Sequence, residues 1–433
     1  QMCIRDSTSS TTLLDDFKNK NILKDLSLSL KVRLLNYLGY DLDLATTTTL
    51  PATLTPPKDP FVSMGASIHS YPVQLTYSGD LDANGDLTDT RQQSVLYASM
   101  EGGLRIVDAQ TGAEQMVFLP ADILNKDASR ALRRSEPGSL TYGVDGAWVA
   151  DSAYKFSSTS SASSVIAKQM NVYGGMRMGG ESYYGLDVLT PKSPKFLFRV
   201  GSDLADYSRM GQTWSKPVLA NIRYNNKITR VMIVGGGYDA CYENPQFRLG
   251  NTNPTEYGGG CNKTEAQGNA IYIIDAQTGK RLWWASSSGA NINNSNMKHS
   301  IVSRISTLDR DADGLVDHLY VGDLGGQVFR VDLNNAKDTP TSNLALRVVR
   351  LANLGSDTIA SGNQPRFYQP PTITIHDSGT NTFILVGIAS GDRSTPLDVS
   401  PTVGREGMLP SAALTGRPTN KVFGLIDRDF INK

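Results

Sequence analysis

Two stretches of nearly identical layout decide the fold: LRIVDAQTGAEQMVFLP, residues 104–120, and AIYIIDAQTGKRLWWA, residues 270–285. Each has an apolar strand, an Asp-Ala-Gln-Thr-Gly turn and a second apolar strand. An aspartate at a hairpin entrance accepts hydrogen bonds from backbone N–H groups further along the turn, and Gly112 or Gly279 supplies the positive φ that closes it. The two stretches therefore predict antiparallel hairpins that belong to one repeated unit.

The same order of short strands recurs five times along the chain. The first strands are SYPVQL, LTYGVDGAWVA, SKPVLANI, HSIVSRI and QPPTITI, which begin at Ser70, Leu140, Ser215, His299 and Gln369. The third strands end at Asp108, Asp187, Asp275, Asp332 and Asp427, and a fourth strand follows in the first four copies. Four antiparallel strands repeated around an axis predict an all-β fold, a β-propeller with at least five blades in this chain. A repeated β-sandwich is the competing fold.

The flanking regions divide the chain further. Residues 1–7, QMCIRDS, resemble a translated sequencing adapter and are left out of the fold prediction. Residues 8–45 have leucines at mostly helical spacing and predict a short helical segment, and residues 46–65 are a Pro/Thr-rich linker. Residues 66–433 form the propeller, in which the serine-rich run 157–164 is expected to be a loose surface loop. No partner segment follows the last strand, so we expect the chain to be an internal piece of a longer protein.

Charge and hydropathy exclude several classes of partner. Lysine plus arginine and aspartate plus glutamate number 42 each, so no overall field favours nucleic acid or an anionic membrane. No apolar run approaches the roughly 18 to 20 residues that a transmembrane helix needs.

The four histidines lack metal-ligand spacing and are expected to be packed or surface residues. Trp283 and Trp284 are expected to pack between neighbouring blades.

The segment DRDADGLVD, residues 309–317, has the spacing of a calcium loop. Asp309, Asp311 and Asp313 take positions 1, 3 and 5, and Gly314 at position 6 permits the sharp turn that points the Leu315 carbonyl at the metal. Asp317 takes position 9, while position 12 is Tyr320 where an EF-hand has glutamate. Hard oxygen ligands favour Ca²⁺ over zinc or copper. The alternative is an acidic turn without metal.

A second acidic loop, DLDANGDLTD at residues 80–89, is a possible second metal site. Asp80, Asp82 and Asn84 take positions 1, 3 and 5, and Asp89 stands in for the ligand at position 9 if one residue is inserted. The alternative is a solvated turn.

Cys241 and Cys261 lie in a stretch rich in Gly, Asn and Pro that has no apolar period. A disulfide that closes about 20 residues stabilises a fold by roughly 3 kcal/mol and implies an oxidising compartment. The alternative is two unrelated thiols.

Several stretches, taken in order, resemble the C-terminal propeller of type IV pilus tip proteins of the PilY/PilC kind. They are GASIHSYPVQL, LYASMEGGLRIVDAQTGAE, GGESYYGLDVLTPKSPKFLFRV, GQTWSKPVLANI, DRDADGLVDHLYVGDLGGQVFRVDL and ASGDRSTPLD. The resemblance covers residues 66–433 and implies about seven blades in an intact member.

The resemblance implies a calcium-binding protein at the pilus tip, outer membrane or cell surface of a Gram-negative bacterium. Such a protein supports pilus assembly, opposes retraction, and aids adhesion and twitching motility. Its partners would be minor pilins and a host or abiotic surface. Asp309, Asp311, Asp313 and Asp317, with the Leu315 carbonyl, match the family's calcium ligands, and no catalytic residues are implied.

An enzyme of another class shares part of this pattern. Quinone-dependent dehydrogenases are propellers with a similar Asp-x-x-Thr-Gly-Lys-x-x-Trp turn, found here from Asp275 to Trp283. That turn is structural in those enzymes, and the adjacent cysteines beside their quinone do not occur in this chain. A third class, an outer-membrane assembly scaffold built on such blades, would lack the acidic loop.

Overall fold

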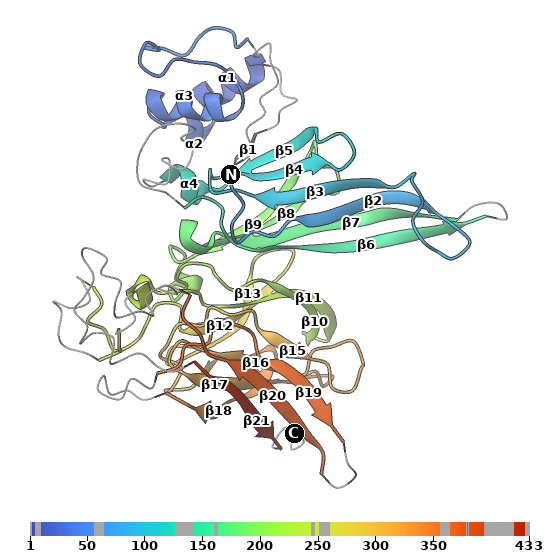
Figure 1. The fold of residues 1–433 in the computed structure, drawn as a ribbon, viewed down its shortest axis with the longest axis vertical. Coiled ribbons are helices and arrows are strands. Elements are labelled where there is room, and N and C mark those ends of the chain that lie inside the picture. The colour runs from blue at the N-terminus through green and yellow to red at the C-terminus, as the bar shows by residue number, and fades with distance from the viewer. Residues whose placement is uncertain are drawn as a thin grey trace. The chain divides into compact units, whose positions relative to one another are not determined.

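A computed structural model describes residues 2–4, 10–55, 65–125, 142–159, 163–243, 247–250, 260–355, 364–377, 379, 381–393 and 420–428. The chain divides into two compact units, Gln1–Phe198 and Arg199–Lys433. Each unit consists mainly of antiparallel sheets, which Figure 1 shows as successive groups of arrows.

Unit 1 begins with a helical segment in the range that the leucine spacing predicts. It comprises α1 (Ser10–Asn19), α2 (Asn21–Lys24) and α3 (Leu28–Tyr37). The hydroxyl of Ser27 accepts a hydrogen bond from the Leu30 backbone N–H at 3.2 Å and caps α3. Leu14, Phe17 and Leu34 are fully buried and belong to the same apolar core as the strands of unit 1. The helices thus bury one face against the sheet.

The first repeat folds as β2 (Val73–Leu81), β3 (Gln92–Ala98), β4 (Leu104–Asp108) and β5 (Glu114–Leu119), in sequential antiparallel order. The short helix α4 (Ala121–Asn125) follows β5. Beyond β5 the sheet gains β1 (Met2–Ile4), so part of the stretch 1–7 that was left out of the fold prediction is paired.

The second repeat differs from its prediction. Its first strand, β6 (Trp148–Ser158), starts at the end of the expected LTYGVDGAWVA segment and forms a long hairpin with β7 (Ser163–Gly175). The run 157–164, expected to be a loose loop, contributes paired residues to both strands, so that expectation was wrong at Ser157, Ser158, Ser163 and Ser164. The hairpin extends well beyond the neighbouring strands of unit 1 in Figure 1.

The first two repeats share one sheet. β2 pairs with β3 from Val73 to Ser78, with a register shift between Thr76 and Ser78, and its end pairs on the opposite edge with β7, Ser78 opposite Ile166 and Leu81 opposite Ser163. The order is β1-β5-β4-β3-β2-β7-β8-β9, with β6 on the other edge of β7, β8 at Ser182–Asp187 and β9 at Lys195–Gly201. The expectation of separate four-stranded blades was therefore wrong for this pair.

Unit 2 contains three further sheets. The third repeat is β10 (Val218–Tyr224), β11 (Lys227–Gly235), β12 (Ala270–Asp275) and β13 (Arg281–Ser286), with β14 (Ile292–Asn293) added in parallel. The fourth is β15 (Ser306–Leu308), β16 (His318–Gly322), β17 (Gln327–Leu333) and β18 (Ala345–Asn353). The fifth is β19 (Thr372–His376), β20 (Phe383–Ala389) and β21 (Val422–Asp427). Short 3-10 turns lie at Arg177–Gly179, Ala205–Tyr207, Ala240–Glu243 and Thr341–Asn343.

The first strand of the fourth repeat starts later than HSIVSRI predicts. Residues 299–305 are irregular, and β15 begins only at Ser306. Ile301 and Ile305 are nevertheless fully buried in the core shared by the third and fourth sheets, as is Trp283. Trp284 stacks on Tyr272 of its own sheet, and its packing between blades stays a prediction. The apolar alternation in residues 299–305 thus indicates burial and not strand pairing.

The repeated Asp-Ala-Gln-Thr-Gly turns form as predicted. Oδ1 of Asp108 accepts hydrogen bonds from the backbone N–H groups of Gln110 and Thr111, and Gly112 has φ +70°. Asp275 makes the same contacts in the third repeat, where Gly279 also has φ +70°. Throughout the portion of the chain that the structure describes, no helix is both long and apolar enough to cross a membrane.

Candidate metal centre

The acidic loop at residues 309–317 connects β15 to β16 of the fourth sheet. Gly314 has φ +87° and Ala312 has φ +60°, so the loop makes the sharp turn that glycine at position 6 predicts. The loop ends are fixed: the Asp317 N–H donates to the Leu308 carbonyl, and Nδ2 of Asn335 donates to the Val316 carbonyl at 2.8 Å. Contacts to β15 and to the segment after β17 thus hold the C-terminal end of the loop.

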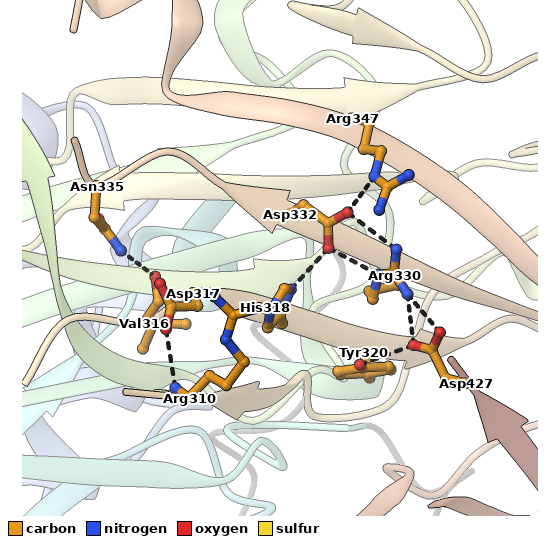
Figure 2. Close-up of polar contacts among 10 residues, drawn as sticks. All are labelled: Arg310, Val316, Asp317, His318, Tyr320, Arg330, Asp332, Asn335, Arg347 and Asp427. Carbon is orange, nitrogen blue, oxygen red and sulfur yellow. Dashed lines mark hydrogen bonds and ion pairs between the residues drawn. The ribbon is translucent and has the colours of Figure 1, made fainter. Parts of the chain in front are cut away.

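Three aspartates of this loop converge. One carboxylate oxygen from each of Asp309, Asp311 and Asp317 lies within 4.8 Å of the other two. Oδ1 of Asp309 is buried and has no hydrogen-bond partner, whereas Oδ2 accepts from the Gly314 N–H at 2.8 Å. Asp317 is 2% exposed, and its Oδ2 accepts from the Arg310 N–H at 2.9 Å (Figure 2). Three like charges this close repel one another strongly without a cation.

The donor set fits a hard divalent cation. Carboxylate oxygens are the ligands that Ca²⁺ takes, and a buried oxygen without a partner is costly unless something binds it. Asp313 lies outside the group of three, and its Oδ1 accepts from the Leu315 N–H at 2.8 Å. The roles of Asp313 and of the Leu315 carbonyl as ligands stay predictions.

The second acidic loop has a different geometry. Oδ1 of Asp82 accepts hydrogen bonds from the N–H groups of Asn84 and Asp86, at 2.8 and 2.9 Å, and Gly85 has φ +85°. Over the residues whose structure is described, the cluster at Asp309 is the one place where three such ligand groups meet, so Asp80, Asp82 and Asp89 are not brought together. The observed contacts are those of an exposed turn.

A buried charge network lies behind the first acidic loop, and the sequence did not reveal it. The Arg330 guanidinium on β17 is fully buried and contacts two strand-end aspartates, Asp332 at 2.7 Å and Asp427 at 2.6 Å (Figure 2). Nδ1 of His318 lies 2.7 Å from Oδ1 of Asp332, and the Tyr320 hydroxyl donates to Asp427 at 3.0 Å. Because Asp427 is on β21, the network joins the fourth and fifth sheets.

The network holds Asp332 ionised. Burial alone would raise the pKa of Asp332, but hydrogen bonds from His318 and Arg330 and the positive charge of Arg330 outweigh it, so the pKa is well below its ordinary range. Arg347 adds a further ion pair at 2.5 Å. Asp332 and Asp427 thus have a partner that the hairpin turn does not supply, because each faces the buried guanidinium of Arg330.

The two loop cysteines are close together. Cys241 and Cys261 form a disulfide with Cα atoms 5.6 Å apart. Near them, Asp239 is buried, accepts from the Cys241 N–H at 3.0 Å and pairs with Lys263 at 2.8 Å. The bridge and these polar contacts act together with the buried rings of Tyr242 and Phe247, whose centroids lie 4.9 Å apart.

Comparisons with known proteins agree with the repeated strand order of a β-propeller. The family described as the PilY1 beta-propeller domain matches residues 61–369. The chain is 23% identical over 424 residues to type IV pilus biogenesis factor PilY1 of Pseudomonas aeruginosa strain UCBPP-PA14, covering 84% of this chain and 32% of that protein. The PilY1 homolog of Xylella fastidiosa strain Temecula1 is 24% identical over 262 residues, covering 60% of this chain and 15% of that protein. The chain thus spans about a third or less of these relatives.

One match among solved structures comes from the same family of pilus factors. The crystal structure of the Pseudomonas aeruginosa PilY1 C-terminal domain matches with a TM-score of 0.46 at 20% identity, over 78% of this chain and 66% of that one. The repeated antiparallel sheets and the family match define a β-propeller, which confirms the predicted fold class. The chain belongs to the PilY1 β-propeller domain family. That membership confirms the resemblance on which the sequence prediction rested.

Proposed function

We propose that this chain is the propeller portion of a type IV pilus biogenesis factor. The observation that carries the proposal is the family match over residues 61–369. The protein would be exported to the pilus tip, outer membrane or cell surface of a Gram-negative bacterium, with minor pilins as partners and without enzymatic activity. Both curated relatives are named as pilus biogenesis factors, which favours this role over a quinone-dependent dehydrogenase.

The loop between β15 and β16 has the ligand groups of a calcium site, and we propose calcium binding as part of this function. Asp309, Asp311 and Asp317 would bind Ca²⁺, and Asp313 and the Leu315 carbonyl would complete the shell. The close approach of three carboxylates and the buried, unpartnered Oδ1 of Asp309 support the proposal. The cation supplies positive charge that relieves their mutual repulsion.

Calcium would act through the strand that the loop feeds. Asp317 immediately precedes β16, and its carbonyl accepts from the Leu333 N–H at the end of β17 at 2.8 Å. Ordering the loop would therefore order two strands of the fourth sheet. We infer that occupancy sets the rigidity needed to oppose pilus retraction and to support adhesion and twitching motility.

Calorimetric titration of the chain with Ca²⁺ tests the site. We expect one site with a dissociation constant of roughly micromolar to millimolar, weakened at least about tenfold by Asp309→Asn. The matched control is Asp82→Asn in the second acidic loop, which should leave the titration unchanged. The same titration of Asp313→Ala tests whether Asp313 is a direct calcium ligand or only shapes the turn. An Asp309→Asn chain that binds calcium as well as the parent would refute the assignment.

A cellular experiment tests the role. In the source bacterium, Asp309→Asn in the full-length protein should reduce surface pili and twitching, while Asp82→Asn should not. Normal piliation after deletion of the whole gene would overturn the biogenesis role itself, independently of calcium.

A further inference from the structure

A polar cleft lies in unit 1, whereas the carboxylate cluster belongs to unit 2. It has a volume of about 550 Å³ and is formed by the start of β3, the turn between β4 and β5, and residues 189–191 after β8. Its size falls in the range of ligand sites, but its lining is mostly hydrogen-bonding side chains, whereas sites for drug-like ligands are mostly apolar. The lining therefore indicates what class of molecule fits.

Two glutamines in the cleft are held by neighbours. Nε2 of Gln93 donates to Oγ1 of Thr76 at 3.0 Å, and Oε1 of Gln115 accepts from the Ser94 hydroxyl at 2.8 Å. Each bond fixes one end of a carboxamide and leaves the other end available, an acceptor on Gln93 and a donor on Gln115. Orienting these groups before binding reduces the entropy cost of capturing a ligand.

Other polar groups of the cleft are available for binding. The side chains of Asp89, Arg91, Gln92 and Gln110 are exposed and make no hydrogen bond or ion pair with any residue whose position is described. They supply two carboxamides, one carboxylate and one guanidinium. Two carboxylates, Asp89 and Asp108, outnumber the single Arg91, which disfavours an anionic ligand.

Tyr77 gives the cleft its aromatic surface. The Tyr77 hydroxyl donates to the Val188 carbonyl at 3.1 Å, which fixes the ring, and Leu189 and Pro191 add the remaining apolar contacts. An aromatic ring beside hydrogen-bond donors and acceptors suits a molecule that carries both hydroxyls and C–H groups. We propose that this cleft binds a neutral saccharide, a function that does not depend on the calcium site or on pilus assembly.

Saturation-transfer NMR on the full chain tests the proposal, with maltotriose, chitotriose and lactose as separate probes. At least one should receive saturation with a millimolar dissociation constant. The double variant Gln92→Ala with Gln110→Ala should weaken that binding at least about fivefold, because two neutral hydrogen bonds are lost. Both positions are exposed, and a thermal melt checks that the variant remains folded.

The repeat offers a matched control. Gln277 occupies the position of Gln110 in the identical Asp-Ala-Gln-Thr-Gly turn of the third sheet and is also exposed. Gln277→Ala should leave saccharide binding unchanged. The proposal is overturned if none of the three saccharides receives saturation, or if the double variant binds as well as the parent. It is also overturned if triglycine binds with the same dependence on Gln92 and Gln110, since that would identify a peptide site.

Discussion

The strand-end aspartates occupy one position of the repeat but do two different things. Asp108 and Asp275 are partly exposed and accept three hydrogen bonds each within their own turn. Asp332 and Asp427 are buried and share Arg330. The difference lies in the neighbour: β17 is buried along its whole length, so its arginine needs carboxylates within reach. The same residue type thus shapes a hairpin in one repeat and joins two sheets in another.

Arg330→Met should have the largest effect on this contrast. The substitution leaves Asp332 and Asp427 buried with reduced compensation, so the free energy of unfolding of unit 2 should fall by about 3–5 kcal/mol. Urea denaturation followed by tryptophan fluorescence measures the loss.

The matched control is Arg350→Met on β18. Arg350 is exposed and bonds only to Oε1 of Gln327, at 3.0 Å, among the contacts described. Its removal should cost under about 1 kcal/mol. Equal losses for the two variants would mean that the buried network adds nothing beyond an ordinary surface contact.

Acid should reveal the ionised state of Asp332. In the unfolded chain the Asp332 carboxylate is protonated near pH 4, whereas in the native protein it stays ionised to lower pH. The stability that its charge contributes is therefore lost progressively as the pH falls below about 4. Urea midpoints of the parent and of Asp332→Asn, compared between pH 7 and pH 3, should converge. Asp108→Asn serves as comparison: hydrogen bonds from Thr111 also lower the pKa of this partly exposed carboxyl, but water screens its charge, so its gap should change less with pH. A gap that stays constant with pH would contradict the assignment.

Asp275→Ala should have a moderate effect. It removes the acceptor of three hydrogen bonds from a turn that is partly solvated, and we expect a loss of about 1–2 kcal/mol in unfolding free energy. Thermal unfolding of unit 2 reports it. A loss as large as that of Arg330→Met would show that the turn, and not the network, limits stability.

Gly112→Ala should have the smallest effect of the series. Gly112 has φ +70° with no other atom within 4 Å of an added Cβ, so only backbone strain opposes the change. A cost of about 1 kcal/mol is expected from the left-handed conformation. Thr111→Ala at the neighbouring position separates strain from lost hydrogen bonding. No measurable change in the melting temperature of Gly112→Ala would show that the turn relaxes.

Local patterns predicted the repeat, the hairpin turns and the helical segment, because each depends on residues close in the chain. The start of β15 was misplaced, since the burial of Ile301 and Ile305 comes from packing between sheets and mimics a strand pattern. The pairing of β2 with β7 was also missed, because no local signal marks a strand whose second edge pairs with a segment far along the chain.

For the candidate site as well, local spacing predicted some contacts, whereas contacts between sheets were missed. The spacing in residues 309–317 predicted that four aspartates converge, and the structure brings Asp309, Asp311 and Asp317 together but leaves Asp313 outside the group. The similar spacing at residues 80–89 did not bring its aspartates together. Arg330 was overlooked because an arginine within QVFRVDL looks like an outward-facing strand residue. Only the neighbouring sheet, which supplies Asp427, shows why it is buried.

The sheet shared by the first two repeats has a consequence for how the protein acquires its fold. Strands β3, β4 and β5 pair with immediate neighbours in sequence and can form as soon as they leave the ribosome or a secretion channel. The end of β2 must wait for β7, which follows far later, and closing so long a loop costs entropy before any pairing repays it. Until then the edge of Ser78–Leu81 that later pairs with β7 is open and exposed to wrong partners.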